Sequence, residues 1–320
     1  MLRTSLIYLS KADWARRTVT RWSVARRVAS RFIAGETLDD AIRVVGELND
    51  KGINATLDHL GEHTTSPEIA NRSTEDVLNM FGAIQNAKVR SNVSIKLTQI
   101  GMALDMDLCA QNLAEILGRA RETGSFVRVD MEDSPWVDKT LDMARRMRES
   151  LGFENVGVVI QSYLFRSEAD IRKLGEEGIR VRLCKGAYKE PPEVAYPQKA
   201  DVDSSYDRLT RLLIDNSRAL GCPELSANGI IPPHPALATH DEARIDAAIA
   251  YIRQTGFPQR SIEFQMLNGI RRDLQEKLAA EGYPVRVYVP YGSEWYPYFT
   301  RRLAERPANL WFFISNFFRR

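Results

Sequence analysis

Short apolar runs alternate along the chain with longer amphipathic segments. The runs are rich in Val, Ile and Leu and end at polar residues, which is typical of buried parallel strands. We expect strands at residues 53–58, 93–97, 126–130, 156–161, 179–183, 235–239, 261–265 and 284–288, each followed by a helix. Eight strands alternating with eight helices predict one TIM-like (β/α)8 barrel of the α/β class. A doubly wound sheet is the alternative, but no G-x-G-x-x-G or Walker loop follows any of these runs.

Capping residues predict where several helices begin. Thr37 stands three residues before Asp40, as in a capping box. Ser66-Pro67 and Ser134-Pro135 each place a proline where the first turn of a helix tolerates it, and Ser167 is expected to cap another helix.

Two further helices are expected ahead of the first strand, at residues 10–34 and 38–50. No change of composition after them marks a linker. With 320 residues, 44% hydrophobic and 27% charged, the chain can build the core of one large barrel. We therefore divide it into a helical extension, residues 1–50, and a catalytic barrel, residues 51–320.

The two ends of the chain differ from the rest in composition. Eight Arg and Lys residues precede Phe32 with one acid, Asp13, among them. Such a segment is a mitochondrial transit peptide or a surface helix, and its continuity with the next helix favours the surface helix. Residues 310–318 are apolar and predict either a helix docked on the core or a foothold on a membrane or partner.

Overall composition restricts the class of protein. The net charge of +2 indicates no nucleic-acid partner, and no apolar run reaches the roughly 18 residues of a membrane-spanning helix. The three cysteines are far apart and odd in number, so we expect neither disulfides nor a cysteine zinc site, as in a reducing compartment. A cytoplasmic protein, with peripheral contact at the inner membrane left open, is the expectation.

Polar residues close almost every predicted strand. They are Asp58, Lys96, Asp130, Gln161, Arg182 with Lys185, Thr239-His240, Gln265 and Tyr288. Because the carboxyl ends of the strands meet at one face of a barrel, these side chains are expected to form a ring around an active site. The ring is rich in cations, which suits an anionic substrate and an anionic cofactor.

The last predicted strand leads into a helix that carries Tyr298, Arg301 and Arg302 within one turn. Two guanidinium groups beside a phenol ring suit a small carboxylate with an apolar body. A solvated surface helix would show the same pattern, and the ring of polar strand ends favours the binding site.

Two other kinds of chemistry need consideration. His59-Leu-Gly-Glu62-His63 matches a zinc motif, but it follows a strand and contains Gly61, so no metal site is expected. Lys96 or Lys185 could instead form a Schiff base with a carbonyl substrate, as in class I aldolases. A non-enzymatic adaptor that binds through the basic N-terminus and the apolar tail is a third alternative.

Six sequence motifs occur together and in order. They are Ser94-Ile-Lys96-Leu97, Asp130-Met131-Glu132, Arg182-Leu-Cys-Lys185-Gly186-Ala187-Tyr188, Ala238-Thr239-His240-Asp241, Glu263-Phe-Gln265-Met-Leu267 and Tyr298-Phe-Thr-Arg301-Arg302-Leu-Ala-Glu305. From about Ile53 to the C-terminus the chain resembles the proline dehydrogenase family, in particular its compact monofunctional bacterial type. The proline-rich segment 228–235 departs from the family pattern, which leaves the shape of the cofactor site at this segment open.

The resemblance implies FAD-dependent oxidation of L-proline to Δ1-pyrroline-5-carboxylate, with hydride transfer to the flavin N5. The residues implied to hold proline are Lys96, Tyr188, Leu267, Tyr288, Tyr298, Arg301 and Arg302, and those implied to hold FAD are Met131, Gln161, Arg182, Lys185, Gly186, Ala187, Thr239, His240 and Gln265. Asp130 and Arg182 are the implied catalytic residues. We further expect Glu62 to pair with Arg301 as a gate when the site closes over substrate.

The resemblance also implies partners. Electrons would pass to a membrane quinone, and a separate pyrroline-5-carboxylate dehydrogenase would take the product. The sequence does not distinguish proline from hydroxyproline as substrate.

Overall fold

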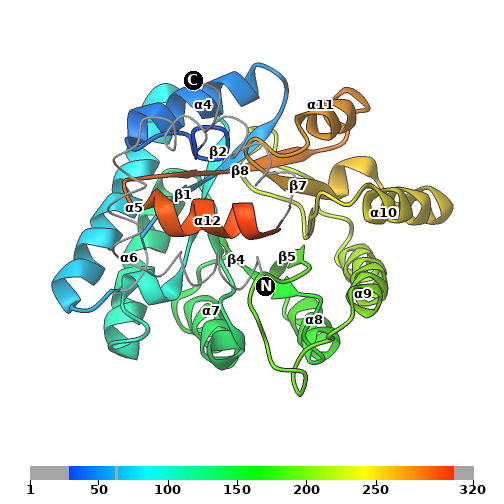
Figure 1. Cartoon of the computed structure of the whole chain (residues 1–320), viewed down its shortest axis with the longest axis horizontal. Coiled ribbons are helices and arrows are strands. Elements are labelled where there is room, and N and C mark those ends of the chain that lie inside the picture. Colours follow the sequence, from blue (N-terminus) through cyan, green and yellow to red (C-terminus); the bar gives the residue numbers. More distant parts are fainter. Residues whose placement is uncertain (1–28, 62–63, 306–320) are drawn as a thin grey trace.

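The computed structural model describes residues 29–61 and 64–305, with side chains described as far as residue 300. Parallel strands close into one barrel in the order of the sequence, as predicted (Figure 1). The strands are β1 (Asn54–His59), β2 (Ser91–Ile95), β3 (Val127–Val129), β4 (Val156–Gln161), β5 (Arg180–Cys184), β6 (Pro235–Ala238), β7 (Glu263–Leu267) and β8 (Val285–Tyr291). The alternative of a doubly wound sheet is wrong, because β1 pairs with both β2 and β8.

Helices surround the barrel between successive strands. They are α4 (Leu38–Asn49), α5 (Pro67–Ala87), α6 (Met106–Glu122), α7 (Val137–Leu151), α8 (Ser167–Glu176), α9 (Lys199–Ala219), α10 (Glu242–Thr255), α11 (Arg272–Ala280) and α12 (Trp295–Glu305). The Thr37–Asp40 capping box is present in both directions, and Ser66 caps α5 as expected. Ser167 is not a cap: it is the first residue of α8, and its hydroxyl donates to the carbonyl of Gln161 at 2.6 Å.

Two other expected boundaries are wrong. The chain has left helical geometry by Ser30, although a helix was expected to continue to residue 34. The eighth strand was expected to end at residue 288, but residues 289–291 extend β8, with Pro290 opposite Asp58 of β1. The added pairing with β1 keeps these residues extended, and the turn comes at Gly292, which has a φ of 124°.

Polar side chains fill the interior of the barrel. Bonds between non-adjacent strands cross it: Arg182 of β5 donates to Ser94 of β2, and Tyr288 of β8 donates to Asp130 at the end of β3. Because alternate residues of a strand face the same side, the register identifies other inward-facing residues. These are Thr56, Asn92, Arg128, Glu263, Gln265 and Arg286, all of them buried. Barrel interiors are usually filled by branched apolar residues, which lie here between the sheet and the helices.

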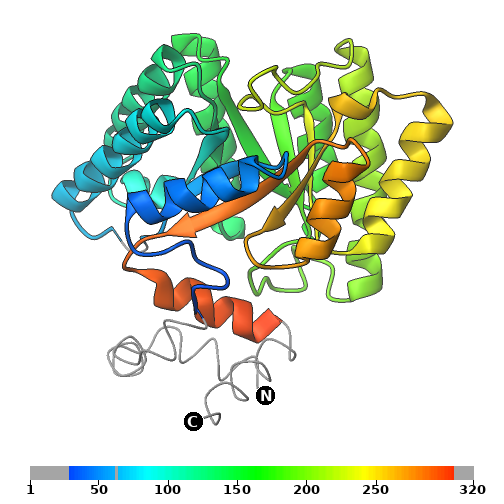
Figure 2. The ribbon, with the colours of Figure 1, turned by 90° about the horizontal axis from the view of Figure 1, so that it is seen from above.

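Helix α12 is held by a second apolar cluster, separate from the main core. Its members are Ala29, Phe32, Ile33, Leu60, Ile270, Trp295, Tyr296, Tyr298 and Phe299. Figure 1 shows α12 crossing in front of the barrel, and Figure 2 shows it at one end. This end is the mouth, defined by the carboxyl ends of the strands, because α12 follows β8 directly.

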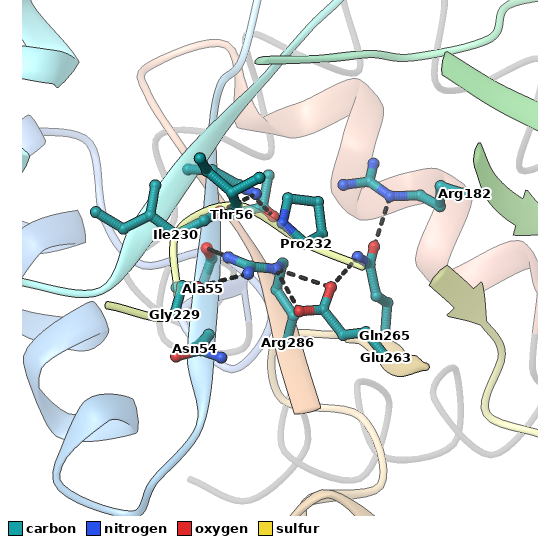
Figure 3. A network of polar contacts seen from close by, with 12 residues as sticks. Asn54, Ala55, Thr56, Arg182, Gly229, Ile230, Pro232, Glu263, Gln265 and Arg286 are labelled. Atoms are coloured by element: carbon teal, nitrogen blue, oxygen red, sulfur yellow. Dashed lines mark hydrogen bonds and ion pairs between the residues drawn. The ribbon is translucent and has the colours of Figure 1, made fainter. Parts of the chain in front are cut away.

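The segment 226–234 closes the opposite end of the barrel, which we call the floor. Its carbonyl oxygens accept hydrogen bonds from inward-facing side chains. Gly229 accepts from Arg286 at 2.7 Å (Figure 3), and Ile230 accepts from Asn92 at 3.1 Å. This proline-rich segment precedes β6, so it lies at the amino ends of the strands, opposite the mouth.

Across the part of the chain that the structure describes, no helix combines the length and the apolar character needed to cross a bilayer.

Candidate active site

Arg182 lies at the centre of the barrel mouth. It projects inward from β5 and is only 4% exposed. Its Nη1 donates to Asp130 Oδ1 at 2.8 Å, and its Nε donates to Gln265 Oε1 at 2.6 Å. The guanidinium also lies 5.4 Å from the centre of the Tyr288 ring. A permanent positive charge is thus fixed in one orientation by an acid, an amide and an aromatic face.

Asp130 follows β3 and uses both carboxylate oxygens. Oδ1 accepts from the hydroxyl of Ser94 at 2.8 Å and from Arg182, while Oδ2 accepts from the phenol of Tyr288 at 2.8 Å. Burial raises the pKa of Tyr288 far above its usual value, and the nearby negative charges of Asp130 and Asp58 raise it further. The phenol therefore remains a proton donor to Asp130 throughout the physiological range.

Lys96 occupies the space between two acids. Its Nζ is 3.3 Å from each carboxylate oxygen of Asp58 and 3.9 Å from Asp130 Oδ2. Asp58 is 1% exposed, and burial raises its pKa in spite of the opposing charge of Lys96. The ammonium group is thereby directed into the mouth, where a substrate carboxylate can meet it.

The residues expected to hold a cofactor lie in strands β4, β5 and β7 or on the loops after β3, β5 and β6. Gln161 donates to the carbonyl of Glu132 at 2.8 Å, and His240 Nε2 accepts from the backbone N–H of Leu267 at 2.9 Å. These two side chains therefore join neighbouring loops. Met131 is buried, and Thr239 accepts from the backbone N–H two residues on.

Lys185 contacts a separate pair of acids. Its Nζ contacts Asp203 at 2.5 Å and Asp241 at 2.6 Å, so it fastens the loop after β5 to the starts of α9 and α10. Gly186 follows with a φ of 126°, and a Cβ added there would lie 2.6 Å from the ring of Tyr163. Ala187 and the 37% exposed Tyr188 continue this loop.

The expected substrate helix is α12. Tyr298 is buried in the second apolar cluster, and Leu267 packs against the same cluster. Arg301 and Arg302 belong to α12, but their side chains lie outside the described residues, as does Glu62 entirely. Leu60, which follows β1 directly, packs in the cluster with α12.

Three residues of the site received no role from the sequence: Ser94, Glu263 and Arg286. A signal for them was present, because each stands two residues before an expected site residue, and so faces the same side of the sheet. Their partners come from other strands, which periodicity does not identify.

The closed barrel and its charged mouth are typical of an α/β-barrel enzyme, and the cations of the mouth suit small anionic groups. The sequence profile described as proline dehydrogenase matches residues 41–314. The chain belongs to the proline dehydrogenase family, and it is an oxidoreductase that oxidises proline in proline catabolism.

Named relatives agree with this assignment. Proline dehydrogenase from Deinococcus radiodurans is 43% identical over 291 residues, which are 90% of this chain and 89% of that protein. Proline dehydrogenase 2 from Bacillus subtilis strain 168 is 38% identical over 310 residues, covering 97% of this chain and 96% of that protein. Among solved structures, proline utilization A from Bdellovibrio bacteriovorus inactivated by N-propargylglycine matches with a TM-score of 0.79 and 26% identity. That match covers 88% of this chain and 33% of the other.

The residues present fit a flavin, on which this family depends. A reduced flavin carries negative charge near its N1, and the buried guanidinium of Arg182 offers a fixed cation. The amide groups of Gln161 and Gln265 reach the same end of the barrel and can both donate and accept. The glycine at 186 lets the β5 loop lie flat against Tyr163, where any side chain would collide.

The surroundings of the two lysines argue against a Schiff-base mechanism. Lys96 faces Asp58 and Asp130, and Lys185 faces Asp203 and Asp241. A Schiff-base lysine requires apolar or cationic surroundings, and both of these lie against carboxylates. Within residues 29–61 and 64–300, no three His, Cys, Asp or Glu side chains gather as metal ligands would.

Proposed function

We propose that this chain is an FAD-dependent L-proline dehydrogenase that forms Δ1-pyrroline-5-carboxylate and passes the electrons to a membrane quinone. The observation that carries the proposal is the fixed cation of Arg182, buried at the mouth beside Lys96 and braced by Asp130 and Gln265. Bound FAD would supply the hydride acceptor at its N5. The chain's own residues bind proline, orient it and exclude water.

The substrate carboxylate is assigned to three cations. Lys96 is already directed into the mouth by Asp58, and Arg301 and Arg302 lie on α12, which crosses that end. Guanidinium groups bind a carboxylate through paired N–H donors, which would fix the orientation of the proline ring. Tyr188, Leu267, Tyr288 and Tyr298 would surround the apolar part of that ring.

Proline must lose a hydride from C5 and a proton from its nitrogen to form the C=N bond. Arg182 favours the arrival of negative charge on the acceptor, because an oriented cation stabilises charge that develops during reaction. Asp130 keeps Arg182 and Tyr288 in place through its two oxygens. The tight positioning of reacting groups can contribute about 7 to 11 kcal/mol toward lowering a barrier.

Glu62 is proposed as a gate. Leu60, two residues before it in the chain, packs in the cluster with α12, which carries Arg301, and this contact supports the proposal that Glu62 pairs with Arg301 when substrate is bound. The variant Glu62→Ala should raise the KM for proline and lower turnover. Unchanged values for both constants would exclude the gate.

The remaining cofactor contacts are assigned to the loops of the mouth. They are Met131, Gln161, Lys185, Gly186, Ala187, Thr239, His240 and Gln265. Of these, Lys185 would bring positive charge to the cofactor. It would also anchor the β5 loop, because its two described partners, Asp203 and Asp241, are carboxylates on α9 and just before α10.

A visible spectrum of the purified protein tests the proposal. We expect a yellow protein with flavin absorbance that proline bleaches without oxygen, and turnover when a quinone or dye is added. A colourless protein that borohydride traps with a carbonyl substrate would instead identify an aldolase. If proline left the flavin spectrum unchanged, the substrate assignment would be wrong.

A further inference from the structure

A fully buried ion pair lies in the barrel interior, below the active site. Arg286 of β8 donates from Nε to Glu263 of β7 at 2.9 and 3.1 Å, and the two side chains are 1% and 0% exposed (Figure 3). Neither residue has a role in the chemistry described above. Such a pair contributes little net stability, because removing both charges from water costs about as much as their attraction returns.

Arg286 cannot reorient within this site. Its Nη1 donates to the carbonyl of Ala55 in β1 at 2.7 Å, and its Nη2 donates to the carbonyl of Gly229 in the floor segment at 2.7 Å. All three nitrogens of the guanidinium are thus in use. Glu263 is therefore held by the Arg286 guanidinium, which the carbonyls of β1 and the floor segment keep in place.

Glu263 determines the orientation of the next polar residue on its strand. Its Oε1 accepts from Gln265 Nε2 at 2.5 Å, and Gln265 Oε1 accepts from Arg182 Nε at 2.6 Å. A carboxylate can only accept here, so the amide must turn its nitrogen toward Glu263. The amide oxygen then faces Arg182, which needs an acceptor. A reversed amide would oppose acceptor to acceptor at Glu263 and donor to donor at Arg182.

We propose that Glu263, held by Arg286, is a positioning residue that sets the amide of Gln265 and thereby the place of the Arg182 guanidinium in the mouth. The contacts run without a break from Gly229 in the floor through Arg286, Glu263 and Gln265 to Arg182 (Figure 3). The inference rests on the proposed function only in assigning Arg182 to the flavin.

The variant Glu263→Gln provides the first test. An amide at position 263 no longer demands the donor end of Gln265, so Arg182 loses its fixed acceptor. We expect kcat to fall about ten- to a hundredfold, as displacement of a reacting group by about 1 Å can cause, with the KM for proline changed less than about threefold. A crystal structure of the variant without cofactor should show the Gln265 amide turned or the Arg182 guanidinium displaced.

A paired exchange separates positioning from stability. In Glu263→Gln/Gln265→Glu, the carboxylate introduced at position 265 again accepts from Arg182, while Arg286 still faces a neutral amide. Positioning predicts that kcat rises several-fold above the single variant while the melting temperature stays low. If kcat stays as low as in the single variant, Glu263 acts through stability alone.

The partly buried pair Arg145–Glu177 offers a matched control. It is also bidentate, at 2.8 and 3.0 Å, but it joins α7 to the end of α8 outside the barrel. Glu177→Gln should leave kcat and the Arg182 geometry as in the parent protein. Unchanged Gln265 and Arg182 positions in Glu263→Gln would overturn the inference, even if kcat fell. Failure of the parent protein to oxidise proline would reject the proposed function and leave this structural readout intact.

Discussion

Tyr288 and Asp130 lie 158 residues apart in the chain and share a hydrogen bond of 2.8 Å across the barrel interior. The same phenol ring faces the guanidinium of Arg182, which also binds Asp130. The three side chains therefore contact one another, and displacing one removes a contact from each of the other two. This relationship is the basis of the first prediction.

Tyr288→Phe should keep the ring and remove the donor. Hydrogen bonds to charged groups contribute about 1.5 to 3 kcal/mol, so we expect kcat/KM for proline to fall about ten- to a hundredfold. Tyr251 donates to Asp215 at the same 2.8 Å distance on the surface, and Tyr251→Phe is the matched control. Steady-state kinetics of both variants measure the expected fall in kcat/KM. An equal effect in the two variants would contradict the role assigned to Tyr288.

Lys96→Met should raise the KM for proline at least tenfold, because one of the assigned carboxylate partners is lost. It also leaves Asp58 buried without its cation, and the pKa of Asp58, already raised by burial, should rise further. The folded state then binds a proton that the unfolded state releases. The free energy of unfolding should therefore fall as pH rises from about 4 toward the raised pKa.

Denaturant titrations between pH 4 and 7 measure this slope. The double variant Asp58→Asn/Lys96→Met should lack it. Lys51→Met is a control, because Lys51 pairs with Glu276 on the exposed surface and such pairs contribute at most about 1 kcal/mol. A pH dependence of the unfolding free energy that persists in the double variant would come from a group other than Asp58.

Gly186→Ala should weaken cofactor binding about tenfold or more. The added methyl group meets the Tyr163 ring at 2.6 Å, and the backbone has a positive φ. Gly178→Ala shares the positive φ, 65°, but its Cβ would meet nothing within 4 Å. The control therefore isolates backbone strain, which costs about 1 kcal/mol. Flavin titration of the two apoproteins compares them, and equal affinities would exclude a steric role for the β5 loop.

His234 should make the protein sensitive to acid. Burial lowers its pKa from 6.5 to about 4, and the cations of Arg180, Arg148 and Arg128 add to the effect. The unfolded state binds the proton first as pH falls, so stability is lost between about pH 6.5 and 4. We expect a loss of about 1 to 2 kcal/mol between pH 7 and 5. In His234→Gln this part of the pH dependence should disappear from urea unfolding curves.

Arg301→Met or Arg302→Met should raise the KM for proline strongly while flavin stays bound. Removing a charged partner of a bound carboxylate typically costs about 2 to 5 kcal/mol. Arg43→Met is the control, since Arg43 pairs with Glu47 on the exposed face of α4. Substrate kinetics and flavin content are measured on the same preparations. Loss of flavin in Arg301→Met or Arg302→Met would mean that α12 binds the cofactor and not proline.

Local patterns predicted the architecture because a parallel barrel repeats one local unit. Each buried strand is a continuous apolar run, and each is followed by an amphipathic helix, so order and type of elements follow from periodicity. The eighth strand shows where this fails. Pro290 and Tyr291 are typical of a turn, and their extension depends on pairing with Asp58 and His59, more than 200 residues away.

The sequence by itself determined the family, the barrel and the polar strand ends that line its mouth. Strand alternation indicates which residues face inward, and the six ordered motifs identify the family. The tertiary structure alone decided which of these residues meet. Asp130 contacts Tyr288 and Arg182 because β3, β5 and β8 enclose one interior, and Glu263 reaches Arg182 because Gln265 lies between them. The physical reason is closure: a local pattern specifies the direction of a side chain, whereas the partner comes from the opposite side of the barrel.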